Sequence, residues 1–295
     1  MRTCCTTAVH VALLGVFFAG VWNSCALEAG ISWDDLGDRK VTALGRGVLK
    51  AGGATWSHAE GSNLVFHATA PELIASLGPV GEFLDRRMTL YLGVGRGKRK
   101  NHVFLVGDDA LWNEAIRGGD RRKDSLGVQF RTDLFLLIRL DSAAMVYALS
   151  HEMAHFRLWQ RYGDDVPLWL DEGVASYAGW EAAQDYMLSV GKDLYRDRPS
   201  IGVKQFMTVD ALTAVRVYPA GEAAFRAFCR ESEELVYVIA RKIGKDRLAD
   251  FIDAVVEDEL SWKEALQTRF GCDESVFADL ENEVTVRLQT ENEHD

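Results

Sequence analysis

The residue types best suited to chemistry lie at residues 151–155, which read HEMAH. Two histidines four positions apart on a helix project from the same face, so His151 and His155 can bind one cation together. Glu152 lies beside them, where its carboxylate can take a proton from a metal-bound water. The alternative is that both histidines are ordinary core residues and Glu152 is solvated, but burying three such groups without a partner is costly.

A second segment strengthens the metal interpretation because it resembles a known arrangement. Residues 167–177 open with Pro at an expected first helical turn and continue as PLWLDEGVASY. This pair of motifs resembles that of the gluzincin zinc peptidases, and most closely the peptidase MA-like proteins, over about residues 63–288. The resemblance implies that Glu172 is the third metal ligand and Zn²⁺ the cofactor. Asp171 is the rival ligand, although an acid is also common in an early helical turn.

Two histidines and one glutamate suit a catalytic zinc site, since they leave the fourth tetrahedral position for water. The expected function is therefore an exported metallopeptidase that hydrolyses peptide bonds through a zinc-bound water, with Glu152 as general base. The competing function is a catalytically silent, zinc-stabilised protein of the cell envelope that binds a peptide or protein partner. The intact Glu152 favours the enzyme.

The resemblance also indicates where a substrate would lie. Gly127, Val128, Gln129 and Phe130 fall where these enzymes have an edge strand that lines the cleft and pairs with a peptide backbone. An ordinary hairpin strand is an equally good interpretation of these four residues. The strand contains no glutamate to bind a free amino terminus, so aminopeptidase activity is not implied.

One departure from the family concerns the residue that stabilises the oxyanion. The tyrosine that the aminopeptidase-like branch supplies from its helical half corresponds here to Cys229. Tyr218, Tyr177 and Arg226 are candidate substitutes, and the sequence does not choose among them. Loss of such a donor typically costs about 10²- to 10³-fold in turnover, which favours weak catalysis or a binding role. Ser176, one turn after the glutamate ligand, is expected either to orient a ligand or simply to pack between helices.

The elements that must position these residues follow from hydrophobic periodicity. Strands are expected at residues 63–67, 103–106, 127–130 and 134–140, and helices at 71–92, 109–116, 142–162, 222–243, 246–257, from 262 onward and from about 273. This order predicts an α+β, zincin-like fold. A mixed sheet with helices comes first, the zinc helix follows, and the C-terminal half is all helical.

The expected division of the chain has four parts. Residues 1–26 are a signal peptide, 27–62 a lead-in with weak strand signals at 41–49, 63–163 the α/β subdomain with the zinc helix, and 164–295 the helical subdomain with the third ligand. Export to a secreted, periplasmic or envelope-associated location follows. No membrane span is expected after cleavage, although Cys25 as a lipidated N-terminus is a competing interpretation.

Composition limits the partners and the crosslinks. The formal net charge of −11, from 44 acidic and 33 basic residues, argues against a nucleic-acid partner, because phosphate binding requires basic clusters. A peptide or protein substrate is the expected partner. Of the five cysteines, Cys229 and Cys272 clearly remain after signal cleavage, which allows one disulfide at most.

Overall fold

The computed structural model describes residues 30–94, 99–116, 127–138, 142–194 and 207–292. Its described part is α+β, with one five-stranded sheet in the order β1-β2-β3-β5-β4. The three inner strands run parallel, and the strand at each edge is antiparallel to its neighbour. The strands are β1 (Ser57–Glu60), β2 (Leu64–Ala68), β3 (Asn101–Val106), β4 (Gly127–Phe130) and β5 (Asp133–Leu137).

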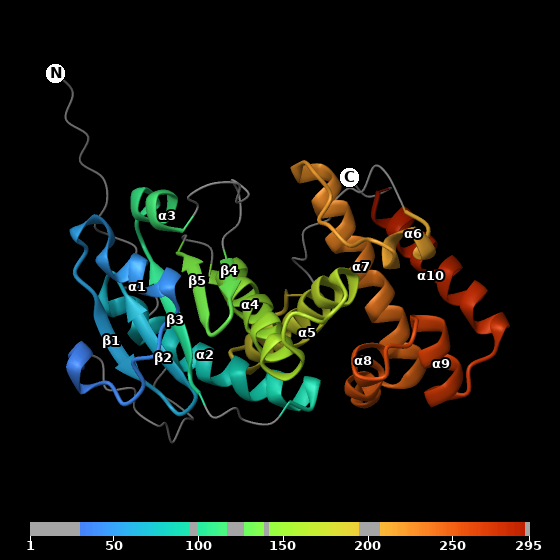
Figure 1. The fold of residues 1–295 in the computed structure, drawn as a ribbon, viewed down its shortest axis with the longest axis horizontal. Helices are drawn as coiled ribbons and strands as arrows, with labels where there is room; N and C mark the ends of the chain where they lie inside the picture. Colours follow the sequence, from blue (N-terminus) through green and yellow to red (C-terminus); the bar gives the residue numbers. More distant parts are fainter. Residues whose placement is uncertain (1–29, 95–98, 117–126, 139–141, 195–206, 293–295) are drawn as a thin grey trace.

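Helices cover both faces of the sheet and then continue as a separate helical layer beyond it (Figure 1). The short helices α1 and α3 lie against one face of the sheet, and the longer α2 and α4 pack against the other. The helices are α1 (Ala43–Lys50), α2 (Pro71–Leu92), α3 (Asp109–Ala115), α4 (Ser142–Tyr162), α5 (Leu168–Ser189), α6 (Val209–Thr213), α7 (Glu222–Ile243), α8 (Leu248–Val256), α9 (Trp262–Phe270) and α10 (Glu274–Asn292).

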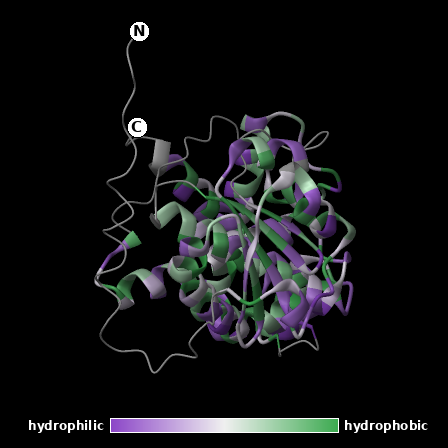
Figure 2. Ribbon diagram, turned by 90° about the vertical axis from the view of Figure 1, so that its left-hand side faces the viewer, coloured by the Kyte–Doolittle hydropathy of each residue, from purple (hydrophilic) through white to green (hydrophobic). Residues whose placement is uncertain are grey.

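One hydrophobic core runs from the sheet into the helical half. It contains strand residues such as Phe66 and Leu105 together with Leu149 of α4, Val174 of α5 and Leu235 of α7. Figure 2 shows the strands as a hydrophobic centre and the helices around them as mixed in polarity. Burial of this continuous apolar surface holds the two halves together, because apolar area removed from water is the main stabilising contribution.

Close helix packing brings α5 against α4 on one side and α7 on the other, and two glycines permit it. A Cβ on Gly173 would lie 2.5 Å from the backbone oxygen of Ser232 in α7. A Cβ on Gly179 would lie 3.0 Å from the backbone of His151 in α4. The glycine that follows Glu172 therefore has a packing role, since it sets how closely α5 approaches α7.

Replacing Gly173 with Ala is expected to destabilise the fold. The new methyl group would overlap α7 backbone that cannot rotate away, and overpacking of this kind costs about 1–3 kcal/mol. Urea unfolding followed by circular dichroism measures the loss. Gly47→Ala is the matched control, because a Cβ there meets nothing within 4 Å. Equal stability of the two variants would contradict the packing role.

The prediction of a strand at residues 41–49 is wrong, because this segment forms α1. The Thr42 side chain accepts a hydrogen bond from the Gly45 backbone N–H and so caps the helix, which a strand reading of the β-branched residues missed. The lead-in also contributes β1, so the sheet begins before residue 63. The last expected strand ends earlier than predicted, at Leu137, and residues 139–141 lie outside the described residues.

Most other expected elements are confirmed. The expected helix from 262 onward is α9, which a capping box formed by Ser261 and Glu264 opens. The helix expected at 246–257 begins with a 3-10 turn, and the short α6 was not predicted. Cys229 and Cys272 do not form a disulfide with each other. The predicted signal peptide and the lipidation alternative at Cys25 lie outside the described residues. Among the described helices, none is both long and apolar enough to cross a membrane.

Candidate metal centre

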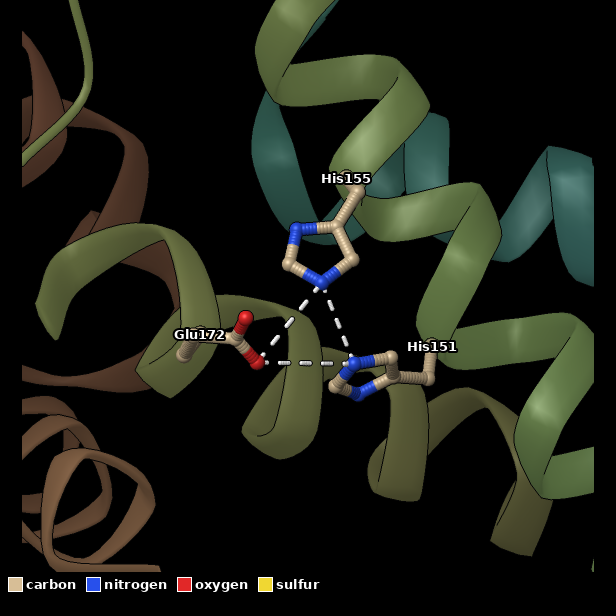
Figure 3. Close-up of side chains that lie close together, drawn as sticks. All are labelled: His151, His155 and Glu172. Carbon is tan, nitrogen blue, oxygen red and sulfur yellow. Dashed lines mark hydrogen bonds and ion pairs between the residues drawn. The ribbon is translucent and has the colours of Figure 1, made fainter. Parts of the chain in front are cut away.

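Two neighbouring helices point three potential ligands at one another. His151 and His155 project from one face of α4, and Glu172 projects from the first turns of α5 (Figure 3). The Nε2 atoms of the two histidines lie 3.1 Å apart. The Glu172 Oε2 atom lies 3.8 Å from Nε2 of His151 and 3.9 Å from Nε2 of His155. Within the described residues, this group could hold a metal ion.

The donor set fits a tetrahedral cation of zinc's size. Bonds of about 2.0–2.1 Å in a tetrahedral site place neighbouring ligand atoms about 3.4 Å apart. The three observed separations of 3.1, 3.8 and 3.9 Å surround that value, so sub-ångström side-chain movements would complete the coordination. Glu172 is 6% exposed, and burial of a carboxylate beside two imidazoles favours a bound cation.

Asp171 orients one ligand and is not itself a member of the ligand group. Its Oδ1 atom lies 2.9 Å from Nδ1 of His155, so the carboxylate accepts the N–H of that ring and directs Nε2 toward the centre. Burial lowers the pKa of His155, but Asp171 and the nearby glutamates outweigh it and raise the pKa to about 10 in the metal-free protein. Burial and the neighbouring imidazole lower the pKa of His151.

Ser176, which the sequence left open between orienting a ligand and packing between helices, approaches the other histidine. Its Oγ atom lies 3.5 Å from Nδ1 of His151, which is the long limit of a hydrogen bond. Tyr147 of α4, which the sequence did not single out, also lies beside His151. Its ring centroid lies 5.9 Å from that of His151, and its hydroxyl hydrogen-bonds with Ser176.

Replacing Asp171 with Ala is expected to weaken metal binding by about 10- to 100-fold, because it removes the partner that fixes the His155 ring. Ser176→Ala should have a smaller effect because its contact with His151 is longer. Competition titration with a chromophoric zinc chelator measures both. Asp185→Ala, which alters a carboxylate of the same helix that pairs with Tyr91, is the control. Unchanged affinity in Asp171→Ala would show that the contact does not support the metal site.

Glu152 lies between the metal ligands and the edge strand. A Cβ on Gly127 would lie 2.6 Å from Cγ and Oε1 of Glu152, so any larger residue there would displace the Glu152 side chain. The backbone N–H of Gln129 donates a hydrogen bond to the same carboxylate. Burial raises the pKa of Glu152 to about 7, and Glu172 adds to the rise while His155 opposes it. Such a pKa near neutrality suits a group that must both accept and release a proton.

The predicted substrate strand is β4, and it is an edge strand of the sheet. Gly127 pairs with Leu136 and Gln129 with Leu134, so these two residues share the sheet face that packs against α4. Val128 packs into the cluster on the opposite face, and Phe130 is 38% exposed at the strand end. The structure therefore brings β4 beside Glu152. Because β4 also forms a hairpin with β5, its position fits both interpretations of this segment.

Of the three candidate oxyanion donors, the structure brings only Tyr218 to the ligands. Its hydroxyl donates a hydrogen bond to Glu172, and burial together with the neighbouring carboxylates raises its pKa. The Cys229 Sγ atom lies 3.4 Å from Oε2 of Glu172. Tyr177 instead neighbours Glu181 and Tyr237, away from the ligands.

Arg226, the third candidate, forms an exposed ion pair with Glu222 one turn earlier on α7. Its guanidinium is therefore committed to the helix surface. The sequence missed Tyr147 because an aromatic residue at helical spacing is indistinguishable from core packing. Spacing did offer a signal for it, because Tyr147 lies four residues before His151 on the same helical face.

No protein-family model matches this chain, and no curated protein matches it either. The side-chain geometry is therefore the basis for assigning a function.

Proposed function

We propose that this protein is a zinc-dependent metallopeptidase of the gluzincin type with a zincin-like fold. The observation that carries the proposal is the convergence of His151, His155 and Glu172 on one point, with Glu152 beside them against the edge strand. The composition of the ligand group, two histidines and one glutamate on adjoining helices, and the edge strand beside Glu152 both support peptide hydrolysis. The resemblance in the two motifs supports the same class.

His151, His155 and Glu172 would hold the Zn²⁺ ion, which when bound would supply a Lewis acid and lower the pKa of water in the site to about 7. Glu152 accepts the proton of the attacking water and delivers it to the leaving amine. The hydrogen bond from Gln129 and the contact with Gly127 hold its carboxylate in place. Asp171 holds His155 in the tautomer whose Nε2 is free to bind the metal.

The edge strand positions the substrate in this proposal. Its outer edge offers backbone groups to an extended peptide, and the residues that face α4 lie beside Glu152. A peptide added to this edge would run past the metal ligands. Expected substrates are therefore extended peptides or unfolded protein segments.

Tyr218 is our candidate for the group that stabilises the oxyanion. With zinc saturating, Tyr218→Phe is expected to lower kcat by about 10²- to 10³-fold with little change in KM, because the lost hydroxyl would turn from Glu172 to the developing charge. Steady-state hydrolysis of a fluorogenic peptide measures it. Tyr177→Phe, whose hydroxyl lies away from the ligands, should leave kcat unchanged. Equal kcat in wild type and Tyr218→Phe would remove Tyr218 from catalysis.

A second candidate function is a silent, zinc-stabilised binding protein of the cell envelope, and one observation favours it. Cys229 occupies the position that the resemblance assigns to the tyrosine, and its thiol contacts Glu172. Loss of that donor is consistent with lost catalysis. Tyr218 beside the same ligand favours the enzyme, which is why we place peptidase activity first.

A broad peptide library distinguishes the two functions. We expect the zinc-loaded protein to cleave internal peptide bonds, detected by mass spectrometry, and a chelator to stop cleavage until zinc is restored. Binding without cleavage would favour the silent protein. Export to the cell envelope or outside the cell belongs to the same proposal, and N-terminal sequencing of the mature protein tests cleavage after Ala26.

A further inference from the structure

Three buried histidines form a chain on the sheet face opposite the metal centre. His58 of β1, His67 of β2 and His102 of β3 lie on adjacent strands, and each is less than 10% exposed. The Nδ1 atoms of His58 and His67 are 2.9 Å apart, and Nε2 of His67 is 2.9 Å from Nδ1 of His102. Because His67 uses a different nitrogen for each neighbour, the three rings cannot converge on one metal ion.

Residues 30–42 cover this chain, and we call them the N-terminal strap. The backbone N–H groups of Gly30 and Ile31 donate to the His58 carbonyl at 3.0 and 3.2 Å. The Trp33 ring centroid lies 5.6 Å from that of His58 and 5.7 Å from that of His67. The Asp38 carboxylate lies 3.8 Å from Nε2 of His102. The strap therefore touches all three histidines.

The direction of the hydrogen bonds follows from the Asp38 carboxylate. A neutral imidazole has one N–H and one acceptor nitrogen. The Asp38 carboxylate lies 3.8 Å from Nε2 of His102, too far for a hydrogen bond, but its charge favours the N–H on that nitrogen. Nδ1 of His102 then accepts from His67, whose Nδ1 in turn accepts from His58. These tautomers are assigned from the network. With three neutral rings, both contacts between histidines are satisfied.

The number of protons that the chain can hold is limited by this geometry. Each of the two hydrogen-bonded nitrogen pairs holds one proton, and the outer nitrogens, Nε2 of His58 and Nε2 of His102, hold one each. The chain therefore holds four protons at most, which is one more than the three protons of the neutral rings. Its positive charge is balanced by Asp38. A second added proton has no such place, because it would set two N–H groups against each other in one pair. The chain must then open.

We propose that this histidine chain makes attachment of the N-terminal strap depend on pH, so that uptake of a second proton in mild acid releases the strap from the sheet. Burial lowers the pKa of all three histidines, that of His102 to about 4, although Asp38 opposes the shift there. A released strap would expose the rings and return them toward their ordinary pKa of about 6.5. The released state therefore binds more protons, and acid favours it between about pH 6.5 and 4.

Other charged groups around the chain titrate differently. Burial raises the pKa values of Glu60 and Asp38, but hydrogen bonds from Lys100 and the strap backbone outweigh burial and lower both values. The contacts of these carboxylates with the strap therefore weaken only at a pH below the range in which the histidines take up protons. Lys100 pairs with Glu60. Asp133 on β5 lies opposite His102 in the strand register, and burial raises the pKa of its carboxyl group to about 6. Proton uptake by Asp133 favours the attached strap and so reduces the acid effect.

Hydrogen exchange of the full metal-free chain, with chelator present at every pH, tests the proposal. Peptides covering residues 31–41 should lose protection by at least about 10-fold between pH 6.5 and 4.5, after correction for intrinsic exchange, since each proton taken up changes the equilibrium 10-fold per pH unit. Protection in α8 should not change. The variant His58→Leu/His67→Leu/His102→Leu should keep its strap protection throughout.

Glu60→Gln is the matched control and should retain the wild-type loss, because its own titration lies at lower pH. If the triple variant does not fold, His58→Leu alone removes one titrating ring at the end of the chain and should make the pH dependence shallower. Constant strap protection in the wild type would overturn the proposal. An identical loss in the wild type and in the folded histidine variants would also overturn it. Neither outcome bears on the metal centre.

Discussion

Replacing Glu152 with Gln is expected to lower peptide hydrolysis by about 10²- to 10⁴-fold, the contribution of a positioned general base. The amide keeps the size of the side chain and can still accept the Gln129 N–H, but it cannot take a proton from water. Zinc content and fold should be unchanged, because Glu152 is not among the three converging ligands. Initial rates on a fluorogenic peptide and metal analysis measure both properties.

Glu231→Gln is the matched control for this substitution. Glu231 is another buried glutamate whose pKa burial raises to about 7, and it accepts the Met207 backbone N–H in the helical half. Its neutral replacement should leave turnover unchanged. Wild-type hydrolysis by Glu152→Gln would remove the general-base role, and loss of zinc from that variant would make Glu152 a ligand and contradict the assignment of Glu172.

Replacing His155 with Ala is expected to abolish stoichiometric zinc binding. Two remaining donors cannot enclose the ion, and Asp171 loses the imidazole that it orients. The affinity loss should exceed the roughly 100-fold that removal of an outer partner can cause. Hydrolysis should disappear with the metal. Zinc per chain after dialysis, measured by atomic emission, and competition titration give the result.

The effect of pH on zinc follows from the same histidine, because a proton and the metal compete for Nε2. Asp171 and the glutamates raise the pKa of His155 in the metal-free protein, so acid should displace zinc progressively as pH falls. His58→Leu is the control for His155→Ala, since it removes a buried histidine that lies away from the ligands. Full zinc occupancy in His155→Ala would contradict the assignment.

The parts of the fold that periodicity defines could be predicted from the sequence. The 22-residue α2 and the helix α4 that bears both histidines each have an apolar stripe at helical spacing, and Pro167 marks where α5 begins. The strand expected at 41–49 failed because a side-chain cap outweighs intrinsic strand preference in a short segment. Thr42 both caps α1 and donates to Asp133, a contact separated by 91 residues.

The candidate site was predictable where one helix determines the geometry. Spacing alone places His151, Glu152 and His155 on neighbouring positions of α4, whereas Glu172 needed a resemblance to a family. The contacts of Asp171 with His155 and of Tyr218 with Glu172 depend on how helices meet in space. Sequence spacing carries no such information. The histidine chain was missed for the same reason, since its members come from three strands.

The measurement that tests the metal assignment most directly is anomalous diffraction at the zinc edge from crystals of the zinc-loaded full chain. We expect one strong peak per chain, within about 2.0–2.2 Å of Nε2 of His151, Nε2 of His155 and a carboxylate oxygen of Glu172. Glu152 should lie outside the coordination shell. A peak that excludes Glu172, a Cys229 thiolate as a fourth protein ligand, or no peak at this position would contradict it.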